Sequence, residues 1–180
     1  MLLASTSSAC GANTDVPYVE TQRADHQMSF YAATKKSNEA MAHSYAHLYD
    51  LPITMFRFFT VDGPWGRSDM ALLKFTDAIL KDRPIDVYNH GKIKRDFTYV
   101  DDLVRALSML IDAAPVTGQP ASENDSLSPV APFRVLNIGN NSPVELGDFI
   151  RAIEASCGKT AVKNLMPMQA GDVPATWAYT

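Results

Sequence analysis

Apolar and polar positions along this chain follow two different rhythms, one typical of helices and one typical of buried strands. Apolar residues recur at helical spacing after Ser29, a residue type favoured at helix N-caps, and the sequence Asp50-Leu51-Pro52 ends that predicted helix. The continuous apolar and aromatic run 53–59 then predicts a buried strand. Because such segments keep alternating, the sequence predicts an α/β fold with a largely parallel sheet.

The later segments continue this alternation. A second helix is predicted to begin near Ser68 or Asp69 and to end at Leu80, before the helix-breaking Arg83-Pro84. The remaining predicted elements are strands over 85–88, 94–100, 133–138 and 162–166, a helix capped by Asp101 or Asp102, and a helix opened by the capping-box-like residues 142–145.

Composition narrows the class of protein. The 180 residues are 46% hydrophobic and 20% charged, which is typical of one globular domain and not of a disordered chain. The formal net charge is −4 and the longest basic run is Lys35-Lys36, so we expect no nucleic-acid partner. No apolar stretch approaches the roughly 20 residues of a membrane span. With Cys10 and Cys157 as the two cysteines, a cytoplasmic location is expected.

The candidate chemistry lies in a tyrosine four residues before a lysine, Tyr31 and Lys35, downstream of the hydroxyl cluster 5–8. Residues at i and i+4 share one face of a helix. An ammonium near a phenol stabilises the phenolate and lowers its pKa, so that the phenol can exchange a proton with a substrate hydroxyl. The alternative is an ordinary exposed pair, because this spacing also occurs by chance.

Two other candidates are weaker. His43 and His47 are four residues apart, a spacing that can bind zinc, but no third ligand is evident and a helix-surface or core pair is favoured. Cys10 could be a nucleophile, but no histidine is placed by the sequence to activate it, and a buried thiol is favoured. We therefore expect no metal site.

With these residues in view, the chain resembles the extended short-chain dehydrogenase/reductase family, and within it nucleotide-sugar epimerases of the UDP-glucuronate 4-epimerase type. The matching segments are SFYAATKKSNEAMAHSYAHLYDLP, RFFTVDGPWGRSDMALLKFT, PIDVYNHGK, RDFTYVDDLV, LNIGNNSPVEL and QAGDVPATWA. The resemblance implies the C-terminal part of an NAD(P)-binding Rossmann-like fold, a parallel sheet with flanking helices. Residues 1–60 and 97–138 would form mainly the Rossmann-type layers, and 61–96 and 139–180 mainly a small substrate-binding lobe.

The resemblance also implies a site. Thr6, Tyr31 and Lys35 match the catalytic triad, and Tyr31 and Lys35 would also contact the cofactor NAD. In such enzymes C4 of the sugar is oxidised and then reduced on its other face. The implied contacts to a UDP-sugar are Ser7 and Ser8 at the sugar, Thr60 and Arg67 flanking it, Val87 and Tyr88 at the uracil, Arg95 at the diphosphate and Asp172 near the nucleotide ribose. Arg67 could pair with a uronate carboxylate.

The chain also departs from the family pattern. It contains no G-x-x-G-x-x-G turn, the feature that brings a helix N-terminus to the NAD pyrophosphate. We therefore expect a truncated or degenerate epimerase, or one part of a longer polypeptide, with very low NAD affinity by itself. Asp62 stands where relatives usually carry tyrosine, which removes an aromatic ring and adds a carboxylate near the site.

Several alternatives stay open at this point. The chain could be a non-catalytic remnant with at most weak UDP-sugar binding, or a UDP-sugar decarboxylase or dehydratase of the same superfamily. The family resemblance also implies a possible homodimer through a four-helix contact. Met41, Tyr45, Leu48 and the face over 72–79 could serve that contact, or could equally be buried in the core.

Overall fold

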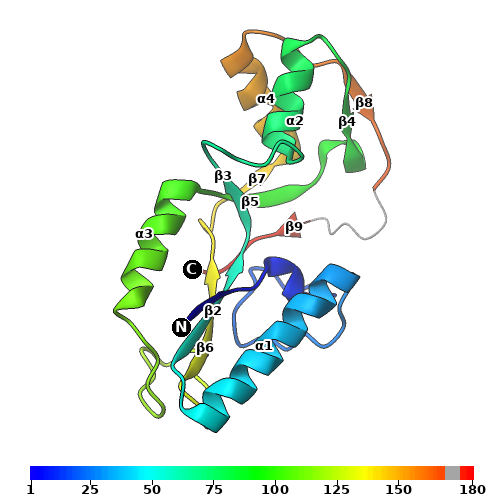
Figure 1. The fold of residues 1–180 in the computed structure, drawn as a ribbon. Coiled ribbons are helices and arrows are strands. Elements are labelled where there is room, and N and C mark those ends of the chain that lie inside the picture. The colour runs from blue at the N-terminus through cyan, green and yellow to red at the C-terminus, as the bar shows by residue number, and fades with distance from the viewer. Residues whose placement is uncertain (169–174) are drawn as a thin grey trace.

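The computed structural model describes residues 1–168 and 175–180, which form an elongated molecule built around three small sheets (Figure 1). The first sheet is parallel, in the order β1 (Leu2–Ala4), β2 (Ile53–Phe58), β6 (Phe133–Ile138). Its register places Leu3, Met55 and Val135 side by side. Helix α1 (Phe30–Tyr49) lies on one side of this sheet and α3 (Val100–Ile111) on the other. The α/β prediction is confirmed.

Helix α1 begins and ends where the sequence predicts. The Ser29 hydroxyl accepts a hydrogen bond from the backbone N–H of Ala32, and Asp50 ends the helix in the left-handed conformation. The sheet-facing side, however, is made of small residues, Ala42 and Ala46, which pack on the strands. The large apolar residues of the helix are exposed: Met41, Tyr45, Leu48 and Tyr49. The sequence left their place open between core and surface, and in this chain it is the surface.

The second sheet connects the two ends of the molecule. Strands β3 (Thr60–Asp62) and β9 (Ala175–Thr176) both run parallel to β5 (Lys94–Tyr99), whereas β7 (Pro143–Glu145) pairs with it antiparallel. The prediction that residues 142–145 open a helix as a capping box is wrong. Pro143–Glu145 form strand β7 instead, and helix α4 (Leu146–Cys157) begins only after Glu145.

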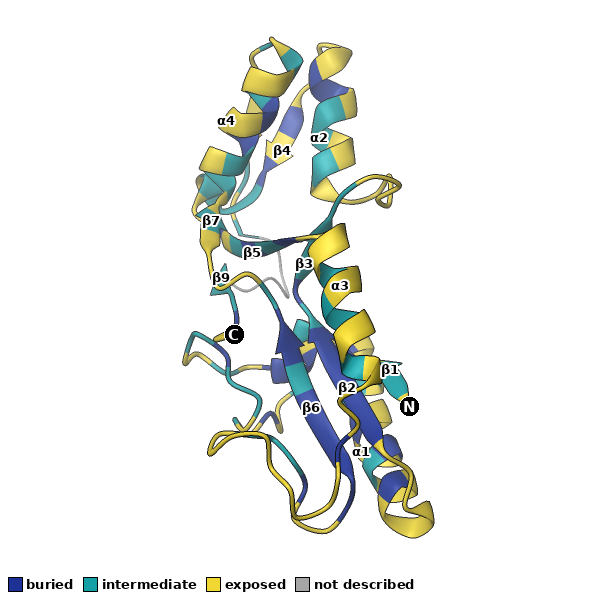
Figure 2. Ribbon diagram, turned by 90° about the vertical axis from the view of Figure 1, so that its left-hand side faces the viewer, coloured by how far each residue is buried: buried dark blue, intermediate teal, exposed yellow. Residues whose placement is uncertain are grey.

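The third sheet pairs β4 (Ile85–Val87) in parallel with β8 (Lys163–Leu165). Helices α2 (Ala71–Leu80) and α4 pack beside it, and their facing sides are buried (Figure 2). Helix α2 starts later than predicted, and its N-cap Met70 makes no side-chain hydrogen bond. The carboxylate of Asp69 pairs with Arg67. Leu80, predicted on its apolar face, is exposed.

Helix α3 is amphipathic in sequence, yet none of its residues is buried in this chain. Its N-cap is Tyr99, so the prediction that Asp101 or Asp102 caps it is wrong; both acids lie in the first turn, where they face the positive end of the helix dipole. Within the described part of the chain, no helix combines the length and the apolar character that crossing a bilayer requires.

Candidate functional site

The hydroxyl cluster follows the carboxyl end of β1, where a parallel strand delivers side chains to one edge of its sheet. Thr6 is the N-cap of a short 3-10 helix, η1 (Ser7–Cys10), and its hydroxyl accepts the backbone N–H of Ser8 at 3.3 Å. Thr6 is buried, Ser7 half-buried and Ser8 exposed. The exposure of the hydroxyls thus increases from Thr6 to Ser8 along the turn, which lies beside the start of α1.

Tyr31 and Lys35 lie on consecutive turns of α1, as their spacing predicts. The Lys35 Nζ lies 5.9 Å from the centroid of the Tyr31 ring, so the ammonium is close to the phenol ring. Tyr31 is 54% exposed, and its hydroxyl makes no hydrogen bond to any described residue. No hydrogen bond joins it to Thr6 either, so the triad is present as neighbouring parts and not as a closed hydrogen-bonded chain.

A small cavity of about 80 Å³ lies between the hydroxyl cluster and the start of α1. It is lined by Ser7, Ser8, Gly11, Tyr18, Met28, Ser29, Ala32 and Thr176. Gly11 has φ +65°, and a Cβ there would approach the backbone oxygen of His26 to 2.4 Å, so the chain needs glycine at this point. Of the residues predicted to contact the sugar, Ser7 and Ser8 line this cavity, whereas Thr60 and Arg67 do not.

Arg95 reaches the neighbourhood of this cavity from β5. Its backbone pairs with Thr176, a lining residue, and its charge acts on the buried phenol of Tyr18. Burial raises the pKa of Tyr18, and the positive charge of Arg95 opposes that rise. Arg95 also donates from Nη1 to the carbonyl of Lys94 at 2.9 Å.

Thr60 is the first residue of β3, and Arg67 lies in the loop that follows this strand. Arg67 donates two hydrogen bonds to Asp69, from Nε at 3.0 Å and from Nη2 at 2.5 Å, and both side chains are exposed. The hydrogen bond to Asp69 raises the pKa of Arg67. Asp62 is half-buried, and burial raises the pKa of its carboxyl.

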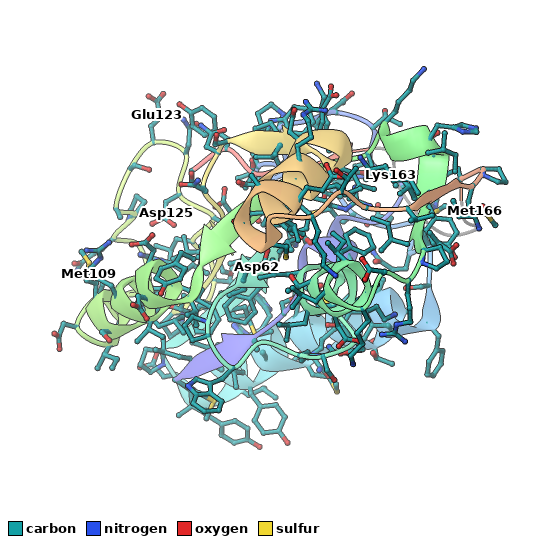
Figure 3. The ribbon with its side chains drawn as sticks, turned by 90° about the horizontal axis from the view of Figure 1, so that it is seen from above. Asp62, Met109, Glu123, Asp125, Lys163 and Met166 are labelled. Carbon is teal, nitrogen blue, oxygen red and sulfur yellow. The ribbon has the colours of Figure 1, made fainter. Side chains whose placement is uncertain are left out.

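The other predicted contacts are not gathered at the cavity. Val87 is buried in the core between α2 and α4. Tyr88 begins a second 3-10 helix, η2 (Tyr88–Gly91), beside Met166, which follows β8 (Figure 3). Asp172 lies outside the described residues.

A buried polar network beneath the site is absent from the sequence-based candidates. Glu39, four residues after Lys35, accepts hydrogen bonds from Ser5 Oγ at 2.7 Å and from Arg57 Nε and Nη2 at 2.8 Å each. Lys36 adds an ion pair at 3.1 Å. Burial alone would raise the pKa of Glu39, but the hydrogen bonds and charge of Arg57 lower it overall. The available signals were an arginine inside an apolar strand and an acid in register with Tyr31 and Lys35.

The two weaker candidates have structural partners. His43 Nε2 lies 2.8 Å from Ser128 Oγ, and His47 Nδ1 lies 2.8 Å from the carbonyl oxygen of Val130, so both histidines fasten the loop before β6 to α1. Over residues 1–168 and 175–180, no group of three or more potential metal ligands comes together. Burial raises the pKa of the Cys10 thiol, which disfavours a reactive thiolate.

Comparison with known proteins gives the class that this fold and site define. The model of the NAD dependent epimerase/dehydratase family matches residues 1–122, and the chain belongs to that family.

Particular relatives narrow the similarity. The chain is 57% identical over 180 residues to Protein CapI of Staphylococcus aureus, covering 99% of this chain and 54% of the relative. It is 55% identical to a probable UDP-glucuronate 4-epimerase of Rhizobium meliloti, covering 99% and 53%. A crystal structure of UDP-glucuronic acid 4-epimerase from Bacillus cereus, in complex with UDP-glucuronic acid and NAD, superimposes with a TM-score of 0.81 at 30% identity, covering 99% and 52%. The chain thus spans about half the length of these relatives.

Proposed function

We propose that this chain forms the proton-transfer and sugar-nucleotide-binding part of an NAD-dependent UDP-glucuronate 4-epimerase. The observation that carries the proposal is the cavity between η1 and the start of α1, which is lined by the hydroxyls of Ser7, Ser8 and Ser29 and by Ala32, the residue after Tyr31 on α1. Likeness to the Rhizobium and Bacillus proteins supports the choice of reaction. Residues 1–60 and 97–138 would supply the catalytic layers, and 61–96 and 139–180 the substrate lobe.

In this proposal Tyr31 takes the proton of the sugar C4 hydroxyl and later returns it. Lys35 stabilises the phenolate, and Thr6 orients the hydroxyl that loses the proton. NAD, when bound, supplies the hydride acceptor and donor at C4. The hydroxyl of Tyr31, which has no hydrogen-bond partner among residues 1–168 and 175–180, and the ammonium of Lys35 suit the nicotinamide ribose. The glycine-rich turn for the pyrophosphate does not occur in these 180 residues.

Substrate recognition is proposed to rest on the residues around the cavity and the adjoining lobe. Ser7, Ser8 and Thr60 would contact the sugar, and Arg95 would hold the diphosphate, since a guanidinium donates in a planar fork. Arg67 would pair with the uronate carboxylate. Val87, Tyr88 and Asp172 would serve the uridine. We also propose a cytoplasmic location and a homodimer through the exposed face of α1.

Turnover tests the proposal. Because low NAD affinity is expected for the chain by itself, it is supplied with the part of the Rhizobium relative that it does not cover, and is then incubated with NAD⁺ and UDP-glucuronate. The nucleotide sugars are separated by chromatography, with Tyr31→Phe as the matched control. Formation of UDP-galacturonate that Tyr31→Phe abolishes would support the epimerase. A decarboxylated or dehydrated product would favour another reaction of the superfamily. Saturable UDP-glucuronate binding without any turnover would favour the non-catalytic alternative.

A further inference from the structure

The carboxylate of Glu39 joins α1, which carries Tyr31 and Lys35, to the end of β1, which leads into the hydroxyl cluster, and to β2. It lies on α1, and it accepts hydrogen bonds from Ser5 at the end of β1 and from Arg57 in β2. Ser5, Glu39 and Arg57 are 3%, 4% and 2% exposed, so these contacts are shielded from water and from salt. Both oxygens of the carboxylate are engaged by described residues.

Ser5 connects this hydrogen-bond network to the proposed site. Ser5 directly precedes Thr6, and its backbone N–H bonds the carbonyl of Phe56 at 2.7 Å. Its hydroxyl links this turn to α1 through the hydrogen bond to Glu39. At the far end of the turn, burial raises the pKa of the Cys10 thiol, and the charge of Arg57 opposes that rise.

We propose that Ser5 is a positioning residue, which through Glu39 and Arg57 sets the spacing between the hydroxyl cluster and the pair Tyr31 and Lys35. This inference rests on the proposed function of the cavity. A buried ion pair adds little stability compared with apolar residues of similar volume, so packing alone does not account for a charged network here. A fixed hydrogen-bond geometry between strand and helix does account for it.

Amide hydrogen exchange tests the positioning without any ligand. The amides of Ser8 and Ala9 bond to Thr6, at 3.3 and 3.0 Å, and report on η1. In Ser5→Ala we expect them to exchange about tenfold faster, because the turn loses its tie to α1. The amides of Ala42 and Ala46 inside α1 should not change. Lys36→Ala is the matched control, because it removes a half-exposed partner of the same carboxylate but leaves Ser5 in place.

Binding then tests the consequence for the site. The ratio of the dissociation constants of UDP and UDP-glucuronate isolates the contribution of the sugar. Ser5→Ala should reduce this ratio about tenfold with UDP affinity unchanged, and Lys36→Ala should keep it. Unchanged exchange at Ser8 and Ala9, equal acceleration throughout α1, or an unchanged ratio would each overturn the inference. A ratio of one in the wild type would instead contradict the proposed function, and exchange alone would then decide the positioning.

Discussion

Asp96 shows how one buried side chain shapes the turn next to the proposed site. It is fully buried beside Arg95 and accepts the backbone N–H groups of three successive residues after β6, Asn140, Asn141 and Ser142, at 2.9 to 3.3 Å. The turn passes so close that a Cβ on Gly139 would lie 2.6 Å from the Asp96 carboxylate. The glycine is therefore required by the close approach of this carboxylate.

Gly139→Ala should lower the free energy of unfolding by about 1–3 kcal/mol, because the methyl group must displace a carboxylate that holds three amides. Urea unfolding followed by circular dichroism measures the change. Gly147→Ala is the control, since the added Cβ meets only the end of the Arg151 side chain, at an ordinary 3.7 Å. Equal loss in both variants would show that the close approach at Asp96 does not matter.

The ionised carboxylate of Asp62 is expected to destabilise the folded chain, to an extent that depends on pH. Burial raises the pKa of its carboxyl in the folded chain above the ordinary value of 3.8. The folded state therefore binds this proton more tightly, and stability is lost as the pH rises through the folded pKa. Asp62→Asn should accordingly raise the thermal midpoint at neutral pH, and the gain should vanish below about pH 3.8. Thermal scans across pH check this, with the same change at an exposed aspartate, Asp15→Asn, as the matched control. A gain in Asp62→Asn that does not depend on pH would contradict burial of the charge as its cause.

At the scale of elements, the buried Glu39–Arg57 pair joins α1 to the first sheet. Arg57→Leu should destabilise the chain by about 3–5 kcal/mol, because it leaves Glu39 buried without its main partner. The double variant Glu39→Leu/Arg57→Leu should recover most of that loss, since an apolar pair of similar volume replaces the ions. Denaturant unfolding of the two single variants and the double variant measures the coupling. A double variant as unstable as the sum of the single ones would contradict this account.

Elements with local signals could be predicted from the sequence. The two ends of α1 could be predicted because its caps, Ser29 and Asp50, act on residues within one helical turn. The spacing of Tyr31 and Lys35 likewise predicts the candidate site. Residues 142–145 were misread because their strand pairing with β5 involves residues far away in the chain. The Ser5–Glu39–Arg57 network could not be predicted for the same reason. Ser5 is 34 positions and Arg57 is 18 positions away from Glu39 in the sequence.

At the scale of the whole molecule, exposed apolar side chains concentrate along α1. Met41, Tyr45 and Leu48 are 55%, 58% and 69% exposed, and an apolar groove of about 320 Å³ lies between this helix and β1. Contiguous apolar surface of this kind is typical of an interface. Helix α3 is the natural comparison, since it exposes Met109 on the other side of the sheet (Figure 3).

Sedimentation equilibrium should therefore find a dimer for the wild-type chain. Tyr45→Lys should shift it toward monomer, because a charge placed in an apolar contact must be desolvated. Met109→Lys, the same kind of change on α3, should leave the dimer intact. A wild-type monomer at high concentration, or dissociation by both variants alike, would contradict an interface on α1.

The most direct test of the account is a calorimetric titration of the purified chain with UDP-glucuronate. We predict a saturable heat with one site per chain. Arg95→Ala should weaken binding about tenfold, which is about 1.4 kcal/mol, because the diphosphate loses its guanidinium. Absence of a saturable heat in the wild type, or equal affinity in Arg95→Ala, would contradict the assignment of a sugar-nucleotide site to these residues.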